Sequence, residues 1–192
     1  LSDWRLPLFK PGVLKGQALA RFVRTQLQGR SIEALPMALG VVATNLHSGK
    51  PILFQRGDAA TAVRASSAIP ALFEPVSIDG QQYVDGGLVS PVPVRFARHM
   101  GADVVLAVDI SNSPQGNSTQ DSFQILMQTF AIMGKSINQL ALKEADWVVR
   151  PALSGVKSAD FSARMRSIEA GRTAMREALP GLKARLAAFE AG

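Results

Sequence analysis

The amino-acid sequence predicts an α/β domain in which a largely parallel sheet carries helices on both faces. Three observations lead to this fold class. The segments 37–44, 104–108 and 147–149 are short, apolar and rich in valine, which is typical of buried strands. Helical patterns alternate with these strands along the chain. The chain has 192 residues with no internal repeat and no linker, so a single domain over residues 1–192 is expected.

The first predicted elements are a helix and a hairpin. A helix is expected over 11–29, because apolar residues recur on one face and a glycine ends the pattern. The strand 37–44 is followed by the turn cluster 47–51 and then by a short apolar strand over 52–54. Two strands joined by a short turn predict a hairpin.

A short helix and a second hairpin follow. Asp58 is a suitable N-cap for a helix that reaches Ala68, and Pro70 ends it. The β-type runs 75–78 and 82–84 flank an Asp-Gly pair, which is a strong hairpin signal.

Three further helices are predicted in the C-terminal half. The first covers 94–100, and the last covers 162–188 with a break at Pro180. Between them, a long helix over 121–144 has a regular apolar stripe, for which a place in the core is favoured over a lipid-binding face or an acyl-chain groove. The stripe consists of Phe123, Leu126, Phe130, Met133, Ile137 and Leu140.

Composition excludes several classes of function. The chain has no cysteine and only two histidines, His47 and His99, so a disulfide scaffold, a cysteine nucleophile and a Cys- or His-rich metal site are not expected. The net charge of +6 is carried without a long basic run, which argues against nucleic acid as a partner. No cofactor motif follows a strand, and no apolar run is long enough to cross a bilayer.

No serine of this chain lies in a nucleophile elbow. The G-x-S-x-G motif places a serine on a sharp turn between a strand and a helix. The motif is absent, because the partial matches at Ser31, Ser118 and Ser136 each lack the second glycine.

Asp85 is the candidate for chemistry. It ends a short β-type run and is followed directly by Gly86 and Gly87. Glycines allow a sharp turn and a close approach of other groups, so the carboxylate can point into a site. The alternative is an aspartate that caps its own turn, and spacing alone favours that alternative. Asp109, after the second predicted strand, is a weaker candidate of the same kind.

Several segments, taken in order, resemble the patatin-like phospholipase family in its bacterial branch. They are RASSAIPALFEPV over 64–76, YVDGGLVSPVPV over 83–94 and GADVVLAVDIS over 101–111. The upstream segments DWRLPLF and MALGVVATNLHSGKPILF are similar to that family too. A DGG triplet by itself is not specific, but this ordered series is.

The resemblance implies a serine acyl hydrolase with a Ser–Asp dyad. Asp85 would be the general base, in a motif completed by Gly86 and Gly87. The serine elbow and the glycine-rich oxyanion loop of the family lie upstream of the DWRLPLF-like segment, and neither is present. We therefore expect this chain to be the C-terminal part of a patatin-like layered domain that lacks roughly its first third.

The expected substrate is a lipid or another carboxylic ester, with no cofactor and with peripheral contact to a membrane. The expected location is cytoplasmic or peripheral at the membrane, and the sequence leaves the oligomeric state open. A non-catalytic lipid-binding or regulatory module of the same fold is the alternative. A dinucleotide-binding domain is a remote third interpretation, because no glycine fingerprint is present.

Overall fold

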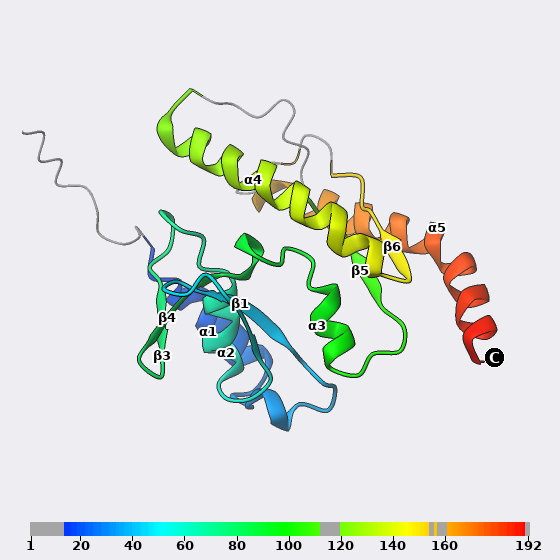
Figure 1. The fold of residues 1–192 in the computed structure, drawn as a ribbon, viewed down its shortest axis with the longest axis horizontal. Coiled ribbons are helices and arrows are strands. Elements are labelled where there is room, and N and C mark those ends of the chain that lie inside the picture. Colours follow the sequence, from blue (N-terminus) through cyan, green and yellow to red (C-terminus); the bar gives the residue numbers. More distant parts are fainter. Residues whose placement is uncertain (1–13, 112–119, 154–155, 157–160, 191–192) are drawn as a thin grey trace, which may run out of the picture. The chain divides into compact units, whose positions relative to one another are not determined.

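The computed structural model describes residues 14–111, 120–153, 156 and 161–190 (Figure 1). The chain forms two compact units, Leu1–Val89 and Ser90–Gly192. The expectation of a single domain over 1–192 stays a prediction.

The first unit is built on a four-stranded sheet. Its strands are β1 (Val41–Asn45), β2 (Pro51–Phe54), β3 (Val76–Ile78) and β4 (Gln81–Asp85), in the spatial order β2-β1-β4-β3. Every neighbouring pair is antiparallel. The two predicted hairpins are confirmed as β1–β2 and β3–β4, and the pairing of β1 with β4 joins them into one sheet.

The prediction of a largely parallel sheet is wrong for the described strands. One parallel pair is present among them, formed by β5 (Leu106–Val108) and β6 (Trp147–Val149) in the second unit. Strands joined by a short turn must run antiparallel, whereas parallel strands need a long crossover. The β5–β6 pair has such a crossover, which contains helix α4 (Ser122–Ala141).

Two helices complete the first unit. Helix α2 (Ala59–Ser66) contacts the strands β1, β3 and β4, and α1 (Gln17–Gln26) packs on α2. Asp58 is the N-cap of α2, as predicted, and its side chain accepts a hydrogen bond from the backbone N–H of Thr61. Residues 11–13 of the predicted helix lie outside the described residues. Within the described part, α1 begins after Gly16, which has a left-handed conformation, and ends before Gln28, which has a positive φ.

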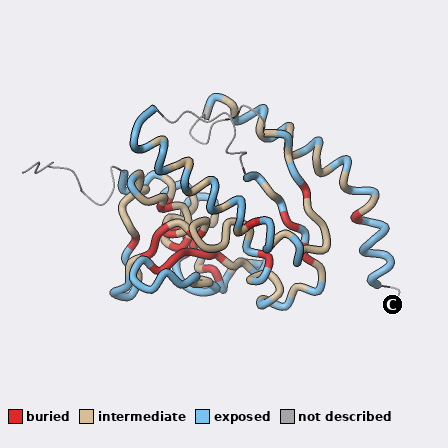
Figure 2. Tube along the Cα trace, turned by 45° about the horizontal axis from the view of Figure 1, so that its top comes forward, coloured by how far each residue is buried: buried red, intermediate tan, exposed pale blue. Residues whose placement is uncertain are grey.

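The core of the first unit lies between α2 and the sheet, where buried segments gather (Figure 2). All five residues of β1 are buried, and the small side chains of α2 allow the helix to approach this strand closely. Phe54 and Tyr83 meet edge to face across the cluster, with ring centroids 5.1 Å apart. The buried apolar residues are Ala20, Ile32, Val41, Val42, Ala43, Ala59, Ala60, Ala62, Ala65, Ala68, Val76, Tyr83 and Val84.

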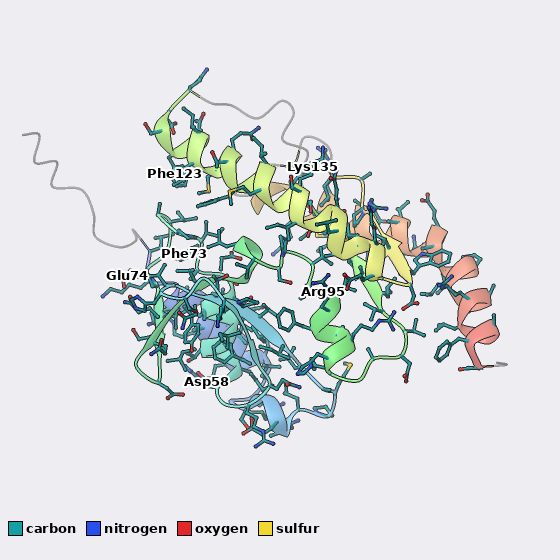
Figure 3. The ribbon with its side chains drawn as sticks, viewed as in Figure 1. Asp58, Phe73, Glu74, Arg95, Phe123 and Lys135 are labelled. Carbon is teal, nitrogen blue, oxygen red and sulfur yellow. The ribbon has the colours of Figure 1, made fainter. Side chains whose placement is uncertain are left out.

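The second unit has a smaller core around the parallel pair. Its buried cluster consists of Val94, Val105 and Ala107, to which α3 (Val94–His99) contributes the first residue. Strand β5 was predicted to be buried, but only its central residue Ala107 is buried. An ion pair between Arg95 of α3 and Glu144 joins α3 to the turn after α4 (Figure 3).

The prediction that the apolar stripe of α4 belongs to the core is wrong for four of its six residues. Phe123, Leu126, Met133 and Leu140 are exposed. The core of this unit is too small to cover a helix of 20 residues. Within α4, Asn138 is the one residue that is buried. None of the helices in the described part of the chain is long and apolar enough to span a membrane.

Helix α5 (Arg164–Glu190) continues through Pro180, whereas a break was predicted there. The helix approaches β6 closely at the next residue. A Cβ atom on Gly181 would lie 2.5 Å from the Trp147 ring. This packing against β6 opposes the tendency of proline to interrupt a helix.

Candidate functional site

Asp85 is the last residue of β4, a central strand of the four-stranded sheet. It lies opposite Ala43 of β1, and a short 3-10 turn (Gly86–Leu88) follows it. The chain therefore leaves the sheet immediately after the carboxylate. This arrangement agrees with the predicted sharp turn at the end of a strand.

Hydrogen bonds hold Asp85 at its amide, its carbonyl and its carboxylate. Its backbone N–H donates to the carbonyl oxygen of Ala68 at 3.0 Å. The hydroxyl of Thr44 donates to its carbonyl oxygen at 2.8 Å. The backbone N–H of Gly87 donates to Oδ1 of its side chain at 2.7 Å. The position of the carboxylate is thus fixed relative to β1, to the end of α2 and to the turn.

The two glycines after Asp85 are required by close contacts. A Cβ atom on Gly86 would lie 2.2 Å from the carbonyl oxygen of Val42, and one on Gly87 would lie 2.9 Å from Oδ1 of Asp85. Neither glycine has a positive φ. Gly86 is therefore required for space, because its neighbour is a backbone atom, whereas a side chain at Gly87 would displace the carboxylate of Asp85.

The carboxylate is half-buried and bonded at one oxygen. Burial raises the pKa of Asp85, and the hydrogen bond from Gly87 partly opposes this change. Within the described residues, no cation forms an ion pair with Asp85, and no group donates a hydrogen bond to Oδ2. The bond from Gly87 means that Asp85 caps its own turn, which is the feature that the alternative interpretation expected, and Oδ2 has no hydrogen-bond donor among the described residues.

Asp85, Gly86 and Gly87 are adjacent in the sequence, and the structure places them at the end of β4 and in the 3-10 turn that follows it. It adds the hydroxyl of Thr44 and the carbonyl oxygen of Ala68, which sequence reasoning did not assign to this site. A threonine within the apolar run 37–44 is the signal that could have identified Thr44, since a buried hydroxyl needs a partner. No sequence signal identifies a backbone carbonyl as a partner.

The other polar candidates have different surroundings. His47 and His99 are both exposed, and neither imidazole donates to the carboxylate of Asp85 in the described part of the chain. Asp109 accepts a hydrogen bond from the backbone of Ser111 and forms an ion pair with Arg150 at 3.4 Å. These partners satisfy Asp109 and fit a structural role at the end of β5. Among the described residues no cluster of acidic or histidine side chains is suited to hold a metal ion.

A family model described as patatin-like phospholipase matches residues 1–98, just over half of the chain. The chain belongs to the patatin-like phospholipase family. The matched region includes the whole first unit and therefore the Asp85 turn.

Individual relatives agree with this family. An uncharacterized NTE family protein of Mycobacterium tuberculosis is 37% identical over 105 residues, which cover 55% of this chain and 29% of that protein. A second such protein of Mycobacterium tuberculosis is 28% identical over 207 residues, covering 93% of this chain and 35% of that protein. A lysophospholipase of Aspergillus oryzae is 34% identical over 77 residues, covering 38% of this chain and 5% of its own length. The chain thus spans about a third or less of each of these relatives.

Proposed function

We propose that this chain carries the general base of a patatin-like acyl hydrolase that cleaves lipid or other carboxylic esters. The observation that carries the proposal is the state of Asp85. Its carboxylate is anchored through Oδ1, and no described residue donates to Oδ2. Membership of a phospholipase family and the similarity to a lysophospholipase support an ester as substrate.

In the proposed reaction Asp85 acts directly on a serine hydroxyl. A serine is a weak nucleophile until a positioned base accepts its proton. Oδ2 accepts the proton while the serine oxygen bonds to the ester carbonyl carbon. When the tetrahedral intermediate collapses, the bond to the alcohol oxygen breaks, and Asp85 returns the proton to this leaving group. Water then attacks the acyl-enzyme by the same steps, with Asp85 again as base.

The raised pKa of Asp85 suits this role. A carboxylate with a higher pKa is a stronger base in its ionised form. Burial supplies the increase, and the Gly87 N–H limits it, so that the carboxylate keeps a defined orientation. The side chain must be ionised to accept a proton, so activity should fall as the pH decreases through this pKa.

We propose that the serine and the oxyanion-binding loop are supplied by residues N-terminal to Leu1. The printed sequence contains no G-x-S-x-G motif, and the chain spans a small part of its relatives. On this proposal both units belong to one patatin-like domain, in which upstream residues complete the sheet and helices cover both of its faces. The alignment over 93% of this chain supports the inclusion of both units.

We further propose peripheral contact with a lipid surface. Helix α4 has one charged residue, Lys135, and exposes several large apolar side chains, which include Met133 and Phe123. Figure 3 labels Lys135 and Phe123 on this helix. Helix α5 is rich in arginine, and cationic side chains are attracted to anionic lipid headgroups. A non-catalytic lipid-binding module of the same fold would share these surfaces but would not need an available carboxylate oxygen.

The proposal is tested by the full-length protein and two variants of the same hairpin. Asp85→Asn keeps an acceptor for Gly87 but removes the base. We expect a loss of esterase activity of about 10,000-fold on a short-chain p-nitrophenyl ester, on the order of the loss of the aspartate of a catalytic triad. Asp79→Asn is the matched control, because Asp79 is exposed at a turn with a φ of 49°, where asparagine is well tolerated. Full activity of Asp85→Asn would overturn the proposal, and an inert wild-type protein would favour the binding-module alternative.

A further inference from the structure

We infer that Thr44 is a positioning residue that holds the general base Asp85 in its reactive orientation. The inference rests on the proposed function of Asp85. It concerns a buried side chain that acts through the main chain of Asp85. The carrying observation is the hydrogen bond of 2.8 Å from the Thr44 hydroxyl to the Asp85 carbonyl oxygen.

The direction of this bond follows from its partners, because a carbonyl oxygen can only accept. Thr44 is 4% exposed and lies in β1, all of whose residues are buried. A buried hydroxyl is costly unless it is paired, so an apolar residue would suit this position if packing were its only role. The acceptor that pairs the Thr44 hydroxyl is the main-chain carbonyl oxygen of Asp85.

The neighbouring buried polar residue has a different task. Asn45 accepts hydrogen bonds from the backbone N–H groups of His47 and Ser48, and it donates to the side chain of Gln81. These contacts stabilise the β1–β2 turn and the adjacent end of β4. Of these two buried polar side chains in β1, Thr44 is the one that bonds to the carbonyl oxygen of the Asp85–Gly86 peptide.

The contacts at this peptide connect the hydroxyl to the carboxylate. The Asp85 carbonyl belongs to the peptide that leads into Gly86, which is packed against the carbonyl of Val42. The next amide, that of Gly87, donates to Oδ1 of Asp85. A rotation of the Asp85–Gly86 peptide would therefore move the donor that orients the carboxylate. The Thr44 hydroxyl restrains that rotation from the side of β1.

The test compares variants of Thr44 in the full-length protein, with esterase activity measured over a range of pH. Thr44→Val keeps the branched shape and removes the donor. We expect a decrease in kcat of about 10- to 100-fold with little change in KM, as for a small misplacement of a reacting group. The acid limb of the kcat/KM profile should move to higher pH, because a weaker bond from Gly87 raises the pKa of Asp85. Thr44→Ser keeps the hydroxyl and should retain activity within about 3-fold of the wild type.

Thr61→Val is the matched control. It also removes a threonine hydroxyl that donates to an aspartate in the first unit, because the Thr61 hydroxyl bonds to the carboxylate of Asp58. It should leave kcat and the acid limb unchanged. If Thr44→Val is too unstable to purify, Thr44→Cys replaces it with the same expectations, because a thiol is a weak donor. An unchanged kcat and acid limb in Thr44→Val, or an equal loss in Thr44→Ser, would overturn the inference. Either result together with an inactive Asp85→Asn leaves the proposed function intact, whereas an active Asp85→Asn removes the proposed function itself.

Discussion

Gly86 lies against the main chain of Val42, so that a Cβ atom at Gly86 would be 2.2 Å from the Val42 carbonyl oxygen. The turn after Asp85 is thus in direct contact with the backbone of the neighbouring strand β1. A backbone atom cannot move aside as a side chain does. The position of the candidate base therefore depends on the integrity of the central strand pair.

Gly86→Ala is predicted to destabilise the first unit by about 3 kcal/mol, at the upper end of the usual cost of overpacking a well-packed region. The added methyl group can be accommodated only if β1 and β4 separate. Urea unfolding monitored by circular dichroism measures the change. Gly171→Ala is the control, because a Cβ atom at this α5 position meets no atom within 4 Å. That variant should be more stable by about 0.5–1 kcal/mol, and equal losses in both variants would contradict the contact argument.

Gly87→Ala is predicted to affect activity more than stability. Its Cβ atom would lie 2.9 Å from Oδ1 of Asp85, a side-chain atom that can rotate away. The rotation would break the hydrogen bond between the Gly87 N–H and the carboxylate and would misplace the proposed base. We expect a loss of kcat of about 100-fold in the full-length protein, as for a reacting group displaced by about 1 Å. The prediction would be contradicted if Gly87→Ala lowered the melting temperature as far as Gly86→Ala does and left kcat unchanged. The orientation of the Asp85 carboxylate would then not determine kcat.

The pKa of Asp85 predicts how stability depends on pH. Burial raises this pKa in the folded state above its unfolded value, so the folded protein binds the proton more tightly. The contribution of Asp85 to stability is therefore most favourable below the unfolded pKa and is lost as the pH rises through the folded pKa. Asp85→Asn removes this ionisation and keeps an acceptor for Gly87.

As the pH rises from about 3 to about 7, the wild type should therefore lose unfolding free energy relative to Asp85→Asn. Urea unfolding at a series of pH values measures the difference. Asp79→Asn is the control, because that carboxylate is exposed at the turn of the same hairpin. A difference that is independent of pH would mean that burial does not raise the pKa of Asp85.

Local signals in the sequence predicted the parts of the first unit that depend on neighbouring residues. Asp58 marked the start of α2 because its side chain caps the backbone N–H of Thr61. The Asp79–Gly80 pair marked the β3–β4 hairpin because such a turn needs positive φ at both residues, and both have it. The same reasoning found Asp85 and its glycines, since a strand followed by a sharp turn is a local feature.

The rest depends on contacts between distant residues, which periodicity does not report. The alternation of strands and helices predicted a parallel sheet, but β1 pairs with β4 about 40 residues later and in the antiparallel direction. The stripe of α4 has the spacing of a core helix, yet the small core around Ala107 leaves most of it exposed. The sequence placed Thr44 correctly in a buried strand but did not identify its hydrogen bond, because the acceptor is the carbonyl of a residue in another hairpin.

The contact between Gly181 and Trp147 predicts how α5 is held in the second unit. A Cβ atom at Gly181 would lie 2.5 Å from the edge of the Trp147 ring. In an exposed helix, alanine in place of glycine would increase stability by about 0.5–1 kcal/mol. Here the clash with the ring should outweigh this gain, and we expect Gly181→Ala to lower the free energy of unfolding by about 1–2 kcal/mol.

A smaller ring should relieve the clash, so Gly181→Ala should cost little in a Trp147→Phe background. The double-mutant cycle, measured by urea unfolding, should give a coupling energy of about 1–2 kcal/mol between the two positions. Gly171→Ala in the same helix should show no coupling to Trp147→Phe, because a Cβ atom there has no neighbour within 4 Å. Strict additivity of Gly181→Ala and Trp147→Phe would show that α5 is not held by this contact, and the continuity of the helix through Pro180 would then need another cause.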